Sequence, residues 1–600
     1  MKRNYILISM ALLGLASCET DFLDRAPLTE ITDTDFFKSA SDLEIYSNGF
    51  YEDINASYQD PGTDNDAINL NGQVTMNQVV TGTLTSANAP GWTWSGDWAK
   101  LRSYNYFLQH AQLLDTTDEE IAHYIGIGRF FRAYFYADMV KSYSDVPWYN
   151  EALSADSEEM YKACDPRAMV MDSVMNDLQY AVDHISEDIG TRTRISKWAA
   201  LALQARVALY EGTYRKYHAE IGLQGDYERF LEKAVEACET IMSSGQFSLY
   251  GNSGADYGLL FNSPSLDSNP EVILQRASDK SLGVSNNTSS VQGWQWSLSR
   301  SLMETYLMAD GSRFTDQPGY DRMGFKDVFE GRDPRFKETF TYPGFKRTES
   351  GSPYIPKIMA GCYDQLKFYP RDESLREGWD MDYTSLPIFR YGEVLLNYAE
   401  AKAELGTLTQ EDLDRSINLL RARVQMPAMS LSDANAHPDA WLIEQYPNVS
   451  GTNRGVILEI RRERRVETAC EGLRWNDIQR WAVGELFALN NEGAYFPSLG
   501  AFDMTGDDRE DIAILANPSD TLRLQGLPAD IRSNLTLYYL EKEDGTDDGF
   551  YLSEGESGHI NFTSYLQNPR HFISPKHYYL PIPLSQMTLN PNLKQPYGWE

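Results

Sequence analysis

Two helical faces constrain the fold more than any other feature of the sequence. On each face, large side chains alternate with alanine at the spacing of a single helix stripe: Phe130, Ala133, Tyr134, Ala137 and Val140 in one segment, and Trp198, Leu201, Ala202, Ala205 and Leu209 in another. Alanine between large side chains lets neighbouring helices approach closely and interlock. The pattern therefore predicts a mainly α fold, a scaffold of helical pairs of tetratricopeptide type, although the sequence shows no strict repeat period.

Changes of texture along the chain predict one composite domain, 18–600, in four parts. We expect helices in residues 18–245 and again in 388–489, a loop-rich insertion with short strands and helices in 246–387, and a loop-rich C-terminal part in 490–600. The helices of the third part are expected at 388–405, 411–424 and 455–483. Because no Gly/Ser-rich or Pro-rich linker separates these parts, we treat them as a single domain.

Two serine or threonine residues mark expected helix starts. Ser41 with Glu44, and Thr117 with Glu120, have the spacing of a capping box and precede runs with apolar periodicity. Helices are therefore predicted to begin at these two positions.

Residues 1–17 are predicted to be a secretory signal peptide. Lys2 and Arg3 precede an apolar run that is too short to cross a bilayer and that ends in Ala16-Ser17-Cys18. Small residues directly before a cysteine are typical of a bacterial lipobox, so Cys18 is the expected lipidation site. Several acyl chains would make such an anchor effectively permanent. The alternative is an ordinary secreted protein in which Cys18 is incidental.

The chain is strongly acidic, with a formal net charge of −34. Such a surface repels polyanions, so no nucleic-acid partner is expected, and polyanionic glycans are disfavoured unless a local basic pocket overrides the field. Aromatic residues make up 12% of the chain. Their rings can stack on the C–H faces of neutral sugars while amides and carboxylates bind the hydroxyls, which makes sugars natural ligands for this composition.

The cysteines give no support for a metal or disulfide scaffold. After Cys18 only Cys164, Cys238, Cys362 and Cys470 remain, far apart and without a C-x-x-C pair. We expect buried free thiols and no metal or other cofactor, with calcium left open because oxygen ligands from distant loops leave no local spacing.

Three short motifs imitate functional sites without the spacing that each site requires. Gly126 and Gly128 lie inside a helical pattern and lack the third glycine of a dinucleotide fingerprint, so close helix packing explains them better. Residues 544–549 imitate a calcium loop, but Thr546 replaces a ligand, which favours a solvated turn. Residues 461–465, Arg-Arg-Glu-Arg-Arg, are explained better by ion pairing with Glu459, Glu463 and Glu467 than by polyanion binding.

Ordered landmarks run from Cys18 to Trp599. In the first half they are Phe22-Leu23-Asp24 and Pro27, Asn48-Gly49-Phe50-Tyr51, Arg129-Phe130-Phe131-Arg132-Ala133-Tyr134, Asp145-Val146-Pro147-Trp148 and Ser196-Lys197-Trp198-Ala199-Ala200. In the second half they are Asn269-Pro270-Glu271-Val272-Ile273, Arg332-Asp333-Pro334-Arg335, Arg390-Tyr391-Gly392-Glu393-Val394-Leu395-Leu396, Arg461-Arg462-Glu463-Arg464-Arg465, Arg480-Trp481 and Leu580-Pro581-Ile582-Pro583. Together they resemble the SusD-like (RagB/SusD) family of outer-membrane nutrient-uptake lipoproteins.

The resemblance implies a tetratricopeptide-like scaffold that carries an irregular ligand-binding part. It also implies a partner, a SusC-like TonB-dependent barrel over which the lipoprotein sits as a lid. Glu19 and Asp21, directly after Cys18, resemble the family's signal for export to the outer leaflet.

The ligand contacts are nominated from residue type and loop context, because the family landmarks are mostly scaffold. The nominated residues are Trp92, Trp94, Trp294, Trp296, Asn287, Tyr320 and Trp379. Trp92 and Trp94 lie in a loop that corresponds in position to a sugar-contacting region of characterised family members. Asn287, with Asn286, could supply amides to hydroxyls. For Trp92, Trp94, Trp294 and Trp296 two alternatives remain open: the ring stacks on sugar, or it pins its loop to the scaffold.

The expected function is that of a non-enzymatic lipoprotein, anchored in the outer membrane and facing outwards. It would bind an oligosaccharide and deliver it to the transporter, which predicts saturable binding without turnover. One alternative is a lipid-anchored glycoside hydrolase that uses a carboxylate pair, since 87 acidic residues leave such a pair open. The other is a structural or adhesive surface protein, which predicts neither binding nor new reducing ends.

Overall fold

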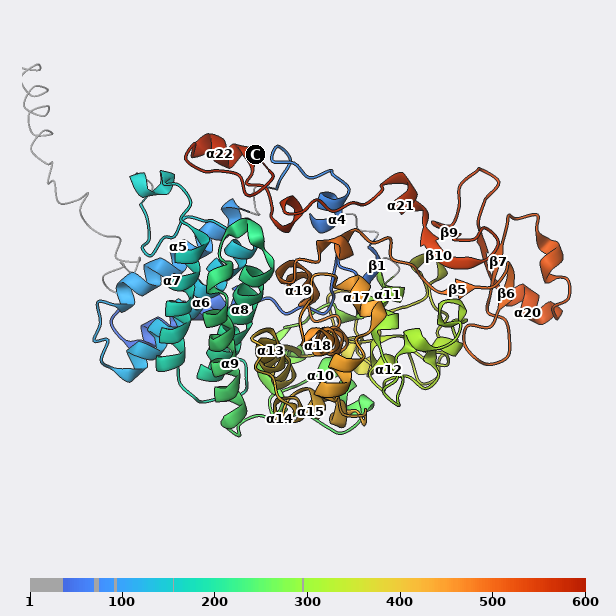
Figure 1. The fold of residues 1–600 in the computed structure, drawn as a ribbon, viewed down its shortest axis with the longest axis horizontal. Helices are drawn as coiled ribbons and strands as arrows, with labels where there is room; N and C mark the ends of the chain where they lie inside the picture. The colour runs from blue at the N-terminus through green and yellow to red at the C-terminus, as the bar shows by residue number, and fades with distance from the viewer. Residues whose placement is uncertain (1–35, 70–74, 91–93, 155, 294–295, 600) are drawn as a thin grey trace, which may run out of the picture.

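The structure is a computed structural model that describes residues 36–69, 75–90, 94–154, 156–293 and 296–599 (Figure 1). Long helices fill one end of the molecule and small β-sheets the other, with short helices and loops between them (Figure 1). The expected signal peptide and Cys18 lie outside the described residues. Among the described helices, none combines the length and the apolar character that crossing a bilayer requires.

Consecutive helices pack against one another in the helical half. They are α3 (Ala40–Ser47), α5 (Ser95–Ala111), α6 (Glu119–Tyr143), α7 (Arg167–His184), α8 (Lys197–Tyr217) and α9 (Glu228–Ser243). Helix α4 (Thr75–Val80) lies apart from them and contacts the 3-10 turn Gly484–Ala488. From α5 to α9 each helix contacts the next, and α13 (Tyr391–Glu404) lies against both α8 and α9. This arrangement of helical pairs confirms the mainly α scaffold.

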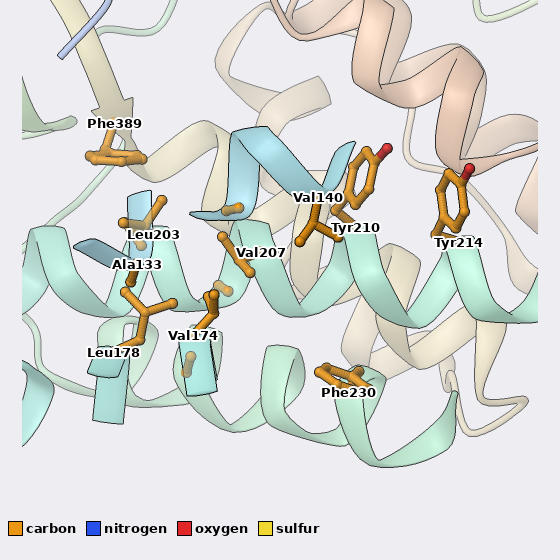
Figure 2. Close-up of a cluster of buried hydrophobic side chains, with 14 of the residues drawn as sticks. Ala133, Val140, Val174, Leu178, Leu203, Val207, Tyr210, Tyr214, Phe230 and Phe389 are labelled. Atoms are coloured by element: carbon orange, nitrogen blue, oxygen red, sulfur yellow. The ribbon is translucent and has the colours of Figure 1, made fainter. Parts of the chain in front are cut away.

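The two predicted apolar faces lie inside this scaffold. All ten residues are buried except Tyr134, which is half-buried. Burial extends almost all round α8, because α7, α9 and α13 surround it. Figure 2 shows the shared layer, in which Val174 and Leu178 of α7 meet Leu203 and Val207 of α8.

The glycines of the partial dinucleotide motif lie at close helix contacts, as predicted. A Cβ on Gly128 would lie 2.8 Å from the ring of Phe107 on α5, and one on Gly126 would lie 2.8 Å from Ile185. Both glycines are therefore required by packing between α6 and its neighbours.

The predicted helix starts are each displaced by one or two residues. The side chain of Ser39, not Ser41, accepts the first-turn N–H of α3, from Asp42. At α6 the cap is Asp118, which accepts the N–H of Glu120. Thr117 instead donates its hydroxyl to Asp115 in the preceding turn. Neighbouring Ser, Thr and Asp residues compete for the same cap, so spacing alone selects the wrong one.

The second half of the chain is built from short elements. Its further helices are α10 (Gly254–Asn262), α11 (Arg300–Thr305), α12 (Phe336–Thr339), α14 (Gln410–Asp414), α15 (Ile417–Arg423), α16 (Leu431–Ala436), α17 (Ala440–Gln445), α18 (Arg454–Glu467), α19 (Arg474–Arg480), α20 (Ala529–Asn534), α21 (Thr563–Gln567) and α22 (Leu584–Leu589). The helices predicted at 411–424 and 455–483 are thus each broken in two.

Four small sheets complete the fold. Their strands are β1 (Asp66–Asn69), β2 (Val272–Arg276), β3 (Trp296–Leu298), β4 (Leu386–Arg390), β5 (Tyr495–Phe496), β6 (Gly500–Phe502), β7 (Ile512–Leu515), β8 (Thr536–Tyr539), β9 (Phe550–Leu552) and β10 (Gly558–Phe562). Strand β1 pairs with β3 and β2 with β4, and the three-stranded sheets have the orders β5-β10-β9 and β6-β7-β8. All pairings are antiparallel except β7 with β8.

Helix α18 joins the two halves through buried charge. Every residue from Gly455 to Glu467 is buried. Arg461 pairs with Glu404 on α13, Arg464 with Asp477 on α19, and Arg465 with Asp64 from the N-terminal part. The predicted internal ion pairing is confirmed, but most partners lie on other elements. Of the three glutamates expected to pair along the helix, Glu459 alone does so, with Arg462.

Candidate functional site

An exposed tryptophan stands at the tip of a turn in the loop-rich part. The N–H of Met381 donates to the carbonyl of Gly378 (3.1 Å), which closes a turn around Trp379 and Asp380. Asp380 has φ +55°, a left-handed conformation that Asp and Asn tolerate. Trp379 is 76% exposed, so its indole faces are open to a ligand.

A neighbouring segment holds this turn in place. The backbones of Asn286 and Asp382 exchange two hydrogen bonds (2.9 and 3.0 Å). The hydroxyl of Ser285 donates to the carbonyl of Asp380 (2.6 Å), and the N–H of Asp380 donates to the Asn287 side-chain oxygen (3.4 Å). The turn that carries Trp379 is thus fixed from the side of residues 285–287.

Further exposed apolar side chains lie on the two segments that hydrogen bonds join at this turn. We call Leu282, Val284, Asn287, Trp379 and Met381 the Trp379 surface. Leu282, Val284 and Met381 are large exposed hydrophobic residues, and Asn287 is half-buried beside the turn. An exposed flat ring with an amide beside its turn matches the two needs of a sugar, stacking for its C–H face and hydrogen bonds for its hydroxyls.

The structure separates the nominated residues. It brings Asn287 and Trp379 together, but Trp296 lies in β3, only 4% exposed, with its indole N–H donating to Gln365 (2.7 Å). Trp296 therefore presents no open face for stacking. It pins its strand to buried hydrophobic residues, which is the second of the two alternatives given above. The amide of Asn286 is also used internally, since it donates to Thr384 (2.6 Å).

Tyr320 occupies a different place from Trp379. It begins a short 3-10 turn, and its half-buried ring packs edge-on against Phe314 with 5.9 Å between ring centroids. Trp92 and Trp294 lie outside the described residues, so their role stays a prediction.

Trp94 borders a groove in the helical half. The ring is 4% exposed and packs edge-on against Trp98 and Tyr143, with centroids 5.6 and 4.9 Å apart. It lines a mainly apolar groove of about 440 Å³ between α5, residues 147–161 and α22, which we call the α5 groove. Its other rings are Trp98, Tyr149 and Tyr161.

Sequence reasoning missed most of both surfaces. Leu282, Val284 and Met381 are isolated apolar residues in polar loops, and such residues are exposed or buried depending on distant contacts. A signal for the turn was present in Gly378-Trp379-Asp380, since glycine and aspartate flank the ring. No local pattern brings Tyr149 and Tyr161 to α5.

The remaining motifs behave as structural features. Within the described ranges, no cluster of three or more His, Cys, Asp or Glu residues is arranged to hold a metal ion. Cys164, Cys238, Cys362 and Cys470 are free thiols. The last three are buried, as predicted, whereas Cys164 is half-buried, although burial still raises the pKa of its thiol to about 12. In the calcium-like run, the N–H of Thr546 donates to the Asp544 carboxylate in an exposed turn.

Comparison with known proteins identifies relatives over most of the chain. The sequence model of the SusD family matches residues 238–599, and a second one, described as starch-binding associating with outer membrane, matches residues 21–209. SusD-like protein P2 of Formosa agariphila is 24% identical over 531 residues, which cover 82% of this chain and 93% of that protein.

Solved structures share the fold. A SusD-like protein of Bacteroides fragilis superposes with a TM-score of 0.67 at 19% identity, covering 96% of this chain and 100% of that one. A SusD-like carbohydrate binding protein of the same species gives a TM-score of 0.66 at 21% identity, over 93% and 100% of the two chains. A laminarin binding SusD-like protein gives 0.54 at 17% identity, over 93% and 98%.

Proposed function

The chain belongs to the SusD family, and from this premise we propose that it is an outer-membrane lipoprotein that binds an oligosaccharide at the cell surface. It passes the ligand to a SusC-like TonB-dependent transporter and breaks no bond in it. The lipid anchor is carried by Cys18 and the protein faces outwards.

The observation that carries the proposal is the 76% exposed ring of Trp379 on a turn held by Ser285, Asn286 and Asn287. A ring that is already fixed in place loses little conformational freedom when a ligand stacks on it. The Asn287 amide beside it can bind a sugar hydroxyl. Two structural relatives, whose names describe a carbohydrate binding and a laminarin binding protein, support this ligand class.

The transporter partner and the lipid anchor rest on other support. The partner follows from family membership, and the anchor from the small residues before Cys18. The absence of catalysis is supported by the missing nucleophile and metal-hydrolase motifs in the sequence. A glycoside hydrolase with a carboxylate pair remains the alternative, and it would release new reducing ends.

The test is a glycan binding screen on the full chain in detergent, followed by calorimetry with each glycan that binds. Replacing Trp379 with alanine should weaken binding by about tenfold to a hundredfold, the effect of losing roughly 1–3 kcal/mol of stacking. The matched control is Tyr161→Ala, which removes another exposed ring, in the α5 groove.

The possible outcomes test the binding site and the function separately. Equal binding by wild type and Trp379→Ala would contradict the site, and a loss only in Tyr161→Ala would move it to the α5 groove. New reducing ends in the same incubations would favour the hydrolase.

A further inference from the structure

The loops that carry the Trp379 surface are rich in carboxylates. Residues 279–289 and 372–382 together contain six Asp or Glu residues, against two cationic side chains, Lys280 and Arg376. A sugar that stacks on Trp379 lies within this field. Its own charge therefore affects how well it binds.

Both cations already form contacts with other groups of this chain. Lys280 forms an ion pair with Glu377. The Arg376 guanidinium donates to the hydroxyl of Tyr369 (2.6 Å) and to the carbonyl of Arg347 (2.7 Å). Neither segment therefore presents an uncommitted cation that could pair with a carboxylate or sulfate group of a ligand.

Asp380 places a negative charge next to the stacking ring. It follows Trp379 in the same turn and is exposed. Its left-handed backbone does not require a carboxylate, since Asn or Gly adopts the same φ readily. Burial, with a smaller contribution from the Asp380 carboxylate, raises the pKa of Asp382, so the field of Asp380 reaches neighbouring groups.

We infer that the Trp379 surface selects uncharged glycans and discriminates against glycans that carry carboxylate or sulfate groups, with Asp380 and Glu377 as the specificity-determining residues. This inference rests on the proposed glycan-binding function. It adds to it the chemical class of the ligand.

The experiment compares three forms of one polysaccharide. The starting glycan is a neutral polysaccharide that binds in the screen, and the other two are its carboxymethyl and methyl ethers. The carboxymethyl ether adds charge and bulk, and the methyl ether adds bulk alone. At low salt we expect the carboxymethyl form to bind about fivefold more weakly than the methyl form, the scale of one unscreened charge pair in water.

Salt and two variants identify the cause of the difference. Raising the salt concentration should narrow the gap by screening, with little effect on the neutral glycan. Asp380→Asn should narrow the affinity gap between the carboxymethyl and methyl forms while preserving the turn. Glu377→Gln should narrow this gap further, because it also releases Lys280 from its ion pair. Glu541→Gln, which removes an exposed carboxylate after β8, should leave it unchanged.

The possible failures are distinguishable. If anionic glycans bind as tightly as neutral ones, and Trp379→Ala still weakens binding, the charge inference is overturned and the proposed function stands. A gap that is insensitive to salt and to Asp380→Asn also overturns the inference. If no glycan in the screen binds, the proposed function fails, and the inference with it.

Discussion

At the scale of single residues, the buried charge of α18 is held by very few groups. The Glu467 carboxylate accepts hydrogen bonds from Arg335 (2.9 Å), Arg390 (2.7 Å) and Arg423 (2.6 Å). Burial alone would raise the pKa of Glu467, but the three guanidiniums hold it well below its usual range. This carboxylate therefore bridges arginines from three separate segments, each of which also pairs with at least one other carboxylate.

Replacing Glu467 with glutamine should destabilise the protein by about 3–5 kcal/mol, because three buried arginines each lose one of their counter-charges. Urea unfolding at pH 7 measures the change, and Glu541→Gln should stay within about 0.5 kcal/mol of wild type.

The difference in stability between wild type and Glu467→Gln should depend on pH. A carboxylate whose folded pKa is depressed contributes stability above its unfolded pKa, near 4.5 here, and loses it as the pH falls further. The gap between wild type and Glu467→Gln should therefore narrow below about pH 4.5. A gap that is independent of pH would contradict the ionised network.

Asp66 should change the pH dependence of stability in the opposite direction to Glu467. Burial raises the pKa of this β1 carboxyl from 3.8 to about 7. One carboxyl oxygen accepts the N–H of Gly62 (3.2 Å), and the other has no partner among the described residues. Since the folded pKa lies above the unfolded one, the wild type should lose stability as the pH rises from about 4 to about 7.

Asp66→Asn removes this titration and keeps an acceptor for Gly62. Its stability relative to wild type should therefore rise by up to about 4 kcal/mol between pH 4 and pH 8. Urea unfolding across that range measures it, and parallel pH profiles for the two proteins would show that Asp66 titrates normally.

Single residues also show what the sequence could and could not predict of the site. Trp296 and Trp379 both lie in Gly- and Ser- or Asp-containing loops, and sequence context treated Trp296 as the stronger candidate. The structure reverses the order, because a strand pairing with β1 and a hydrogen bond to Gln365 bury Trp296. Both partners are far away in the chain, so no local pattern could have distinguished the two rings.

At the scale of elements, close helix contacts depend on glycine. Gly455 lies in the first turn of α18, where that helix meets α16, and a Cβ there would lie 1.9 Å from the backbone oxygen of Ala434. A backbone atom cannot move aside as a side-chain end can. The contact therefore needs glycine for space, not for its backbone freedom.

Gly455→Ala should destabilise the protein by about 3 kcal/mol or more, because α16 and α18 must separate. Gly225→Ala is the matched control, since no atom lies within 4 Å of its Cβ position. Thermal unfolding compares the two. Equal melting temperatures would mean that the α16–α18 contact adapts without cost.

The sequence predicts an element well where the pattern that specifies it is local. It predicts an element poorly where a contact with a distant residue determines where that element ends. The apolar faces of α6 and α8 follow from helical periodicity alone. The break between α18 and α19 does not follow from periodicity. At this break Asp60 accepts the N–H groups of Cys470 (2.6 Å) and Gly472 (2.8 Å), and both of these residues have positive φ. A carboxylate about 400 residues away in sequence thus ends the helix, and periodicity gives no sign of it.

At the scale of the whole molecule, one charged helix connects two hydrophobic cores. The first core lies among the helices, and the second among the short strands and loops that carry the Trp379 surface. Pairs from α18 reach Glu404 on one side and Arg335 on the other. Rigid support from the scaffold is what allows an exposed loop to hold a stacking ring in a fixed position.

The proposed role requires this whole assembly to be held at the membrane, and Cys18 is the proposed point of attachment. A thioether-linked diacylglycerol, with a further acyl chain, binds a bilayer far more firmly than one acyl chain does. Cys18→Ser should therefore prevent lipid attachment and move the protein from the outer-membrane fraction to the soluble one. Labelled palmitate and cell fractionation measure both effects, and Trp379→Ala serves as the control that binds glycan more weakly but keeps its anchor. If Cys18→Ser still incorporated palmitate, the cysteine would be incidental and the anchor would lie elsewhere. Loss of label without release would instead point to a protein partner that retains the chain at the membrane, which is the behaviour expected of a lid bound to its transporter.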